Sequence, residues 1–76
     1  MSKPVTVYSK PNCMQCNFTK QFLLDNDIDF IVKDVEEDAV ALEEVKALGF
    51  SSLPVVVIEG EEPFNGFRPD RLEGLL

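Results

Sequence analysis

The sequence has no histidine, and this absence excludes several kinds of catalytic and metal site. Cysteine-histidine proteases, histidine-assisted acyl transfer and metal centres with imidazole ligands all require that side chain. Basic residues are also scarce, since seven Lys and Arg stand against fourteen Asp and Glu, for a formal net charge of -7. A surface of this sign does not suit phosphate backbones or anionic lipid, so we expect no nucleic-acid partner and no membrane.

Long hydrophobic runs are missing as well. The longest, Val55 to Ile58, is far too short to cross a bilayer, and the first residues lack the apolar core of a secretion signal. No internal repeat, low-complexity tract or linker interrupts the sequence. We therefore expect a cytoplasmic protein.

The length of the chain, 76 residues, leaves room for one small core and for no second domain. Hydrophobic residues make up 45% of the sequence and six residues are phenylalanines, which is enough apolar surface for a globular fold despite the charge. We expect a single domain over residues 1–76 and a monomer.

The two cysteines, Cys13 and Cys16, enclose only two residues between them. A structural disulfide stabilises chiefly by closing a long loop in the unfolded chain, so this pair would contribute little as a staple. Disulfides of cytosolic proteins tend instead to be transient and catalytic. The spacing therefore indicates redox or metal chemistry.

Turn-forming residues divide the chain into short elements, at Pro11-Asn12, 25–27, Gly49, Gly60 and Gly66. β-Branched and aromatic residues predict strands at 5–8, 28–33 and 55–58 and a short strand near 63–65. Apolar spacing predicts a first helix from about Cys13 to Leu24, a second helix that ends at Gly49, and a final helical turn opened by Pro69. The apolar stripes of the first two helices are Met14, Phe18, Thr19, Phe22 and Leu23, and Ala41, Leu42, Val45 and Leu48.

These elements follow the order βαβαββα. The strands at 5–8 and 55–58 are nearly continuously apolar, which suits the centre of a sheet covered by helices on both faces, whereas the other two strands suit its edges. A crossover helix makes the first two strands parallel, and a two-residue turn could make the last two antiparallel. We predict an α/β fold with a four-stranded mixed sheet flanked by three helices.

The cysteine pair falls at the turn from the first strand into the first helix. A helix that begins near Cys13 directs its unpaired N–H groups and the positive end of its dipole at the Cys13 sulfur, and Lys10 adds a cation, so both favour the thiolate. Residues three apart share a helix face, which lets Cys16 attack the Cys13 sulfur and expel a bound partner. We predict that Cys13 is the exposed nucleophile and Cys16 the more buried resolving cysteine, with two buried packing cysteines as the alternative.

Three further features each have a plain structural interpretation. On local grounds Pro54 is a trans turn proline, since cis bonds make up only about 5–6% of X–Pro bonds. The acidic run 36–38 is most simply the start of the second helix and a solvated face. Segment 66–70 could be a loop with Phe67 in the core and a surface ion pair between Arg68 and Asp70 that contributes little.

Three segments nevertheless resemble one known family in order and spacing: 8–16 (Tyr-Ser-Lys-Pro-Asn-Cys-Met-Gln-Cys), 53–57 (Leu-Pro-Val-Val-Val) and 64–70 (Phe-Asn-Gly-Phe-Arg-Pro-Asp). Over essentially the full length the chain is similar to the NrdH-redoxins, glutaredoxin-like proteins of thioredoxin fold that donate electrons to class Ib ribonucleotide reductase. The resemblance implies a nucleophilic Cys13, a resolving Cys16 and a cis peptide at Leu53-Pro54 that faces them. It also implies reduction by thioredoxin reductase with NADPH, and no cofactor or metal bound to the chain itself.

One departure from the family is Phe64, where its members commonly have tryptophan. The change removes an indole N–H and leaves an aromatic surface. We expect Met14, Phe64 and Phe67 in the apolar rim of a docking surface, and we expect the Leu53 backbone groups to pair with an extended partner peptide. The full set of residues expected to contact a partner is Lys10, Met14, Gln15, Leu53, Pro54, Phe64, Gly66, Phe67 and Arg68.

Other functions use the same pair of cysteines. A glutathione-dependent glutaredoxin would hold glutathione partly through Lys10, but the Pro-Tyr usual between the cysteines of that group is Met14-Gln15 here. A carrier of Cu(I) or zinc could use the two thiolates. Small copper chaperones, however, have Met two residues before the first cysteine, where this chain has Pro11, and an element order of βαββαβ. A scaffold without chemistry is the remaining alternative.

Overall fold

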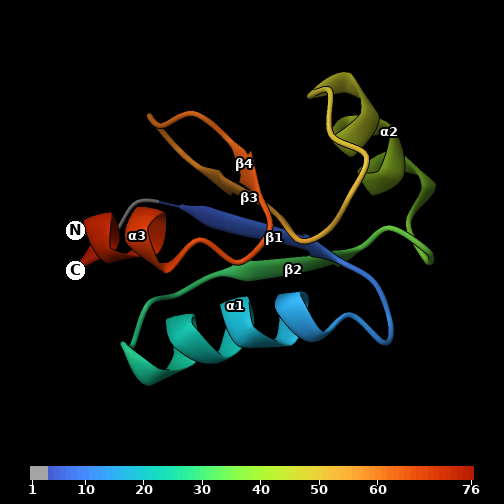
Figure 1. Ribbon diagram of the computed structural model, residues 1–76. Helices are drawn as coiled ribbons and strands as arrows, with labels where there is room; N and C mark the ends of the chain where they lie inside the picture. Colours follow the sequence, from blue (N-terminus) through green and yellow to red (C-terminus); the bar gives the residue numbers. More distant parts are fainter. Residues whose placement is uncertain (1–3) are drawn as a thin grey trace.

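The computed structural model describes residues 4–76 and contains four strands, three α-helices and a short 3-10 helix (Figure 1). The strands are β1 (Val5–Ser9), β2 (Ile31–Asp34), β3 (Val55–Ile58) and β4 (Phe64–Asn65). The helices are α1 (Met14–Asp25), α2 (Ala39–Ala47), α3 (Pro69–Leu72) and the 3-10 helix η1 (Glu73–Leu75). The predicted order βαβαββα is confirmed.

The sheet has the strand order β2-β1-β3-β4, so β1 and β3 are central and the other two strands are edges, as predicted. β1 pairs parallel with β2 and antiparallel with β3, and β3 pairs antiparallel with β4. The four-stranded mixed sheet is therefore confirmed. The two-residue turn considered for the last two strands is wrong, because Val56 pairs with Phe64 and residues 59–63 form the connection.

Side chains alternate along β1 and β3, and this alternation gives the sheet two apolar faces. One face packs against α1 and α3 and contains Val5, Val7, Leu23, Val56, Ile58, Phe64 and Leu72. The other packs against α2 and contains Tyr8, Val35, Ala41, Val45 and Val55. Figure 1 shows α1 and α2 on opposite sides of the sheet. The predicted covering of both faces is confirmed.

The buried face of α1 is narrower than its predicted apolar stripe. The helix buries Cys16, Thr19 and Leu23, at spacings of three and four residues, while Met14 is 71% and Phe18 49% exposed. Only one face of a helix can meet the sheet, and positions 14 and 18 lie together on another. Leu48 is exposed rather than buried, although it continues the spacing of the buried Ala41 and Val45, because it is the C-terminal cap residue beyond the last helical residue, Ala47.

β2 begins at Ile31, later than predicted. The cap residue Asn26 ends α1, Asp27 has a positive φ of 56°, and the Ile28 N–H donates to the Leu23 carbonyl at 2.9 Å. This closing turn occupies the backbone of residues 26–28, so the strand cannot start there. The other predicted breaks also contain residues with positive φ, namely Asn12, Gly49, Gly60 and Gly66.

The acidic run before α2 ends in the helix cap. The Asp38 carboxylate accepts hydrogen bonds from the N–H groups of Val40 and Ala41, and the helix itself begins at Ala39. Glu36 and Glu37 lie in the preceding turn rather than in the helix. The predicted role of this run as the dipole-favourable start of α2 therefore rests on Asp38 alone.

Candidate active site

Three loops meet at one end of the sheet. Tyr8 of β1 lies opposite Val55 of β3, and Val55 lies opposite Asn65 of β4. The loop that follows β1, the loop that precedes β3 and the loop that follows β4 therefore share that end. All three segments that carry the sequence resemblance converge here.

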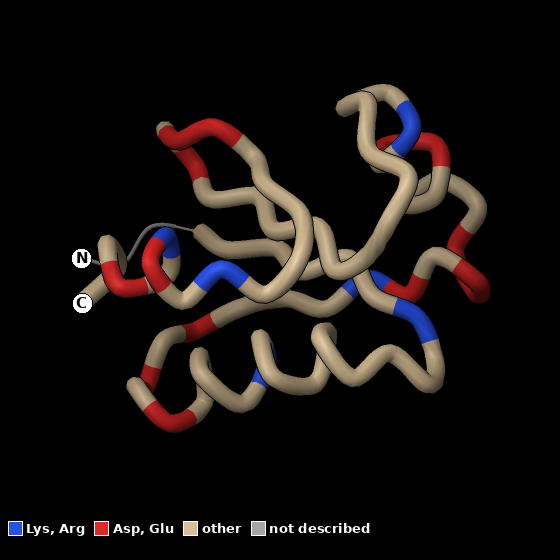
Figure 2. Tube along the Cα trace, in the orientation of Figure 1, with Lys and Arg blue, Asp and Glu red and all other residues tan. Residues whose placement is uncertain are grey.

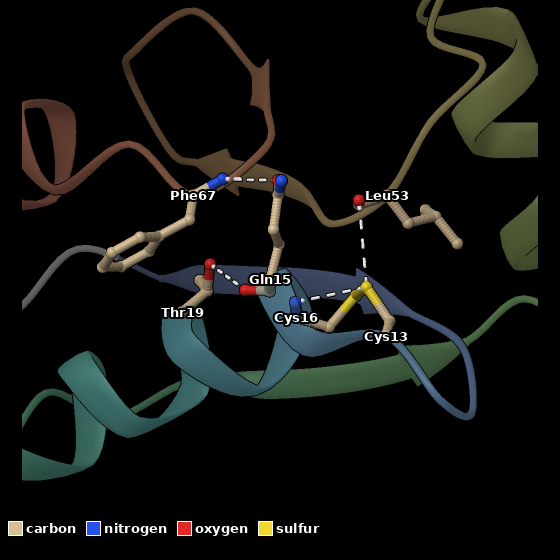
Figure 3. Close-up of a disulfide and its surroundings, with 6 residues drawn as sticks. All are labelled: Cys13, Gln15, Cys16, Thr19, Leu53 and Phe67. Carbon is tan, nitrogen blue, oxygen red and sulfur yellow. Dashed lines mark hydrogen bonds between the residues drawn. A yellow bond between two sulfur atoms is a disulfide. The ribbon is translucent and has the colours of Figure 1, made fainter.

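The cysteine pair occupies the first turn of α1. Cys13 is the N-cap residue, with extended backbone at φ -106° and ψ 104°, and Cys16 lies one turn into the helix. The two side chains form a disulfide, with their Cα atoms 5.2 Å apart (Figure 3). The predicted position at the strand-to-helix turn is confirmed, and the chain is in the oxidised form.

The helix start surrounds the Cys13 sulfur with positive potential. The backbone N–H of Cys16 donates to Cys13 Sγ at 3.2 Å, which is the hydrogen bond of an N-cap with sulfur as the acceptor. No acidic residue lies in the first turn of α1, where its charge would offset the positive potential of the helix N-terminus. On reduction, both effects stabilise a negative charge on Cys13 in preference to Cys16.

Cys16 is completely buried, while Cys13 keeps an exposed fraction of 9%. The predicted order of exposure is confirmed, but Cys13 is a largely covered residue and not the openly exposed one that was expected. Leu53, from the loop before β3, lies over it, and its carbonyl oxygen is 3.8 Å from Cys13 Sγ. Of the two cysteines, only Cys13 therefore keeps any exposed surface.

The Leu53-Pro54 peptide bond is cis, as the family resemblance implied and local expectation did not. Pro54 is buried, and its carbonyl accepts the Gly66 N–H at 2.8 Å. Gly66 has a φ of 81°, a conformation that other residues rarely adopt. The hydrogen bond between Gly66 and Pro54 joins the loop before β3 to the loop after β4.

Gln15, between the two cysteines, contacts the loop after β4. Its Oε1 accepts the backbone N–H of Phe67 at 3.3 Å (Figure 3). A second side-chain bond, from Asn65 Nδ2 to Ser52 Oγ at 2.6 Å, joins the end of β4 to the loop before β3. The sequence did not indicate the contact of Ser52 with Asn65, because the spacing of two polar residues in separate elements carries no signal that they meet.

The apolar surface next to the disulfide differs in membership from the predicted rim. Met14 is exposed as expected, and the half-exposed Phe18 joins it, with its ring centroid 5.9 Å from that of Phe67. The sequence placed Phe18 with Met14 in the apolar stripe of the first helix, but it was not expected in the docking surface. We define the apolar rim as Met14, Phe18 and Phe67.

Phe64 is not part of this rim. It is 4% exposed and belongs to the core cluster on the α1 side of the sheet, because β4 turns that side chain inward. The Arg71 guanidinium lies 4.7 Å from its ring centroid, and Arg71 Nη2 donates to the Glu62 carbonyl at 2.9 Å. The expectation that Phe64 contacts a partner is therefore wrong.

Cations near the disulfide are few, and most are engaged. Arg68 forms the predicted surface ion pair with Asp70 at 3.2 Å, and this pairing lowers the pKa of the Asp70 carboxyl. Arg71 is held by Phe64 and the Glu62 carbonyl. Lys10 is exposed in the loop between β1 and α1. Figure 2 shows the acidic residues gathered in the β3–β4 loop and around the turns after α1 and β2.

Residues 4–76 lack the features of two other classes of protein. No helix in this part of the chain is long and apolar enough to cross a membrane. The same residues contain no group of three or more His, Cys, Asp and Glu side chains arranged to hold a metal ion. The observed element order also differs from the βαββαβ order of small copper chaperones.

Comparison with known proteins gives consistent matches. The sequence profile of the glutaredoxin family, described as "Glutaredoxin", matches residues 5–62. The glutaredoxin-like protein NrdH of Lactococcus lactis subsp. cremoris is 41% identical over 71 residues, which cover 93% of this chain and 97% of that protein. NrdH of Escherichia coli K12 is 38% identical over 93% of this chain and 86% of its own length.

Solved structures agree with the sequence matches. NrdH-redoxin from Escherichia coli, a glutaredoxin-like protein described as having a thioredoxin-like activity profile, superposes with a TM-score of 0.89 at 36% identity. The match covers 96% of this chain and 95% of that one. A glutaredoxin from Archaeoglobus fulgidus superposes with a TM-score of 0.81 at 28% identity, over 99% and 86% of the two chains. The fold is thus thioredoxin-like, and the chain belongs to the glutaredoxin family, among the glutaredoxin-like NrdH redox proteins.

Proposed function

We propose that this protein is a dithiol-disulfide oxidoreductase that donates electrons to class Ib ribonucleotide reductase and is itself reduced by NADPH-dependent thioredoxin reductase. The observation that carries the proposal is the setting of Cys13. Its sulfur caps α1, accepts the Cys16 N–H and faces the Leu53 carbonyl.

The reaction runs through two exchanges in which Cys13 attacks and Cys16 resolves. The reduced Cys13 thiolate attacks a disulfide of the acceptor, forms a mixed disulfide, and releases the other acceptor sulfur as a thiolate. Cys16, as its thiolate, then attacks Cys13 Sγ, which forms the Cys13-Cys16 disulfide and expels the second acceptor sulfur. The acceptor gains two electrons and two protons. Thioredoxin reductase returns two electrons from NADPH by the same exchanges in reverse.

Docking of a protein partner would use the Leu53 backbone and the apolar rim. Leu53 precedes β3 and has no backbone hydrogen-bond partner among residues 4–76, so an extended partner segment can pair with its N–H and carbonyl groups. Such pairing would bring a partner sulfur next to Cys13. Pro54 and Gly66 would hold this edge in place, and Met14, Phe18 and Phe67 would pack against the apolar part of the partner.

A protein reductase fits this surface better than glutathione does. Glutathione carries two carboxylates, and its site needs several cationic or backbone donors. Arg68 is paired with Asp70 and Arg71 is engaged, which leaves Lys10 as the free cation of the described loops around the disulfide. The thioredoxin-like activity profile described for the Escherichia coli NrdH-redoxin supports the same choice.

The remaining parts of the proposal follow from this reaction. The chain needs no resident cofactor or metal, because the reduced Cys13-Cys16 dithiol itself carries the electron pair. We expect the protein to act in the cytoplasm, because NADPH and both proposed partners are found there. We further propose that the chain acts as a monomeric, single-domain carrier over residues 1–76, with one dithiol per molecule.

The decisive experiment measures NADPH oxidation with two reducing systems at matched concentrations, with insulin or a class Ib ribonucleotide reductase as the final acceptor. We expect rapid turnover with thioredoxin reductase and slow turnover with glutathione and glutathione reductase. Cys13→Ser is the control and should abolish turnover. Rapid turnover with glutathione alone would make the protein a glutathione-dependent glutaredoxin. Failure with both systems, together with tight stoichiometric Cu(I) or zinc binding, would favour a metal carrier.

A further inference from the structure

The Gln15 side chain leaves α1 and ends at a backbone group of a distant loop. Its Oε1 accepts the Phe67 N–H at 3.3 Å, across 52 positions of sequence. A Cβ atom built on Gly66 would lie 3.5 Å from the same oxygen, so the backbone of this loop passes directly over the amide. Figure 3 shows the side chain extended from the first turn of α1 to Phe67.

This contact fixes the part of the apolar rim that does not belong to α1. Met14 and Phe18 are carried by the helix, whereas Phe67 comes from the loop after β4. The Phe67 ring reaches the helix through Phe18, at 5.9 Å between centroids, and the Phe67 backbone reaches it through Gln15. The loop is thus attached to the dithiol helix at two points.

The hydrogen bond between Gln15 and Phe67 is not needed to satisfy a buried polar group. Gln15 is exposed, and water could satisfy its amide and the Phe67 N–H equally well. The amide oxygen nevertheless accepts from the Phe67 N–H within the chain, which uses one of its two acceptor positions. A role in holding the loop suits this geometry better than the direct partner contact expected from the sequence.

We propose that Gln15 is a positioning residue that holds Phe67 against Phe18 of the dithiol helix, so that the apolar rim meets a protein partner as one preformed surface. The proposal rests on the proposed function, because it assigns to Gln15 an effect on the binding of the protein reductase. A preformed rim lowers the loss of loop freedom on docking. Loss of the contact should therefore raise KM for thioredoxin reductase and leave kcat nearly unchanged.

The contact itself is tested without any partner, by amide hydrogen exchange of Phe67 in labelled protein. Gln15→Met removes the acceptor at similar length, and Gln15→Glu keeps an oxygen at the same reach. Gln21→Met is the matched control, since the Gln21 amide donates within α1, to Asp25 Oδ1 at 2.8 Å. We expect exchange at Phe67 to be roughly fivefold faster in Gln15→Met, the factor for a hydrogen bond of about 1 kcal/mol. Gln15→Glu and Gln21→Met should stay near the wild-type rate.

The coupling to docking is tested by steady-state reduction with thioredoxin reductase and NADPH. We expect Gln15→Met to raise KM by roughly the same fivefold factor, with kcat within twofold, and Gln21→Met to change neither. Unchanged Phe67 exchange in Gln15→Met, or faster exchange with an unchanged KM, overturns the proposal. If the reductase does not reduce the wild-type protein, the proposed function fails, and the exchange comparison alone decides whether Gln15 holds the loop.

Discussion

The carbonyl oxygen of Leu53 lies 3.8 Å from the Sγ of Cys13, although 40 positions of sequence separate the two residues. This contact puts the reacting sulfur beside an unpaired stretch of backbone at the end of the sheet. A partner strand that pairs with Leu53 therefore lies next to the atom with which it must react. Under the proposed function, this relationship would let a largely covered Cys13 react with a disulfide on an extended segment of a protein partner.

The two thiols should react with alkylating agents at very different rates. Cys13 keeps an exposed fraction of 9% and accepts the Cys16 N–H, whereas Cys16 is fully buried. Brief treatment of the reduced protein with iodoacetamide should therefore label Cys13 at least about tenfold faster, as read by mass spectrometry of peptides. The unfolded protein is the control and should label both alike. Preferential labelling of Cys16 in the folded protein would reverse the proposed roles.

Removal of the resolving thiol should trap the reaction half-way. Cys16→Ser leaves Cys13 able to form a mixed disulfide and removes the sulfur that would release it. Intact mass measurement after mixing the reduced variant with oxidised insulin should show a persistent covalent adduct. Cys13→Ser should give no such adduct, because the remaining cysteine is buried. An adduct of equal yield in both variants would be incompatible with the assigned order of attack.

The apolar rim should contribute to reductase binding without contributing to stability. Met14 is 71% exposed, so Met14→Gln should change the free energy of unfolding by less than about 0.5 kcal/mol. Burial of part of this side chain at an interface is worth about 1 kcal/mol, so KM for thioredoxin reductase should rise roughly fivefold. Val40→Gln, at a site 68% exposed on α2, is the matched control and should leave KM unchanged. Equal effects of the two changes would place docking elsewhere.

The single tyrosine offers an independent check of the α2 side of the sheet. Burial raises the pKa of Tyr8, and the nearby Glu44 carboxylate raises it further, while Lys33, with Nζ 5.6 Å from the ring centroid, opposes the shift. With no tryptophan in the chain, absorbance near 295 nm reports Tyr8 alone. The midpoint should lie above the usual value of about 10 and should fall in Glu44→Gln but not in Glu43→Gln.

The sign of the associated stability change follows from this shift. The native state keeps a proton on Tyr8 that the unfolded chain releases near pH 10. The stability from Tyr8 is therefore fully present below that pH and is lost as pH rises through the higher native pKa. Denaturant unfolding at several pH values above 9 measures the loss. A tyrosine midpoint at or below 10 would contradict the burial and charge around Tyr8.

Local patterns in the sequence were sufficient for the element order, the central strands and the position of the cysteine pair. β-Branched runs, turn residues and helix starts depend on only a few neighbouring residues, so they can be recognised from a short segment of sequence. Alternation along β1 and β3 likewise reflects burial on both faces of the sheet. The redox interpretation of Cys13 and Cys16 needed only their spacing and their place at a helix start.

Tertiary structure decided which aromatic residues are buried and how the three loops contact one another. Phe64, expected in the docking surface, is buried, and Phe18, from the predicted apolar stripe, is half-exposed, since the face that α1 turns to the sheet and the register of β4 set which side chain turns inward. The cis bond at Leu53-Pro54 is disfavoured on local grounds, and only the family resemblance indicated it. The contacts of Cys13 with Leu53 and of Gln15 with Phe67 depend on strand register, because only the pairing of β1, β3 and β4 brings those loops to the same end of the sheet. Short-range propensities contain no information about such pairing.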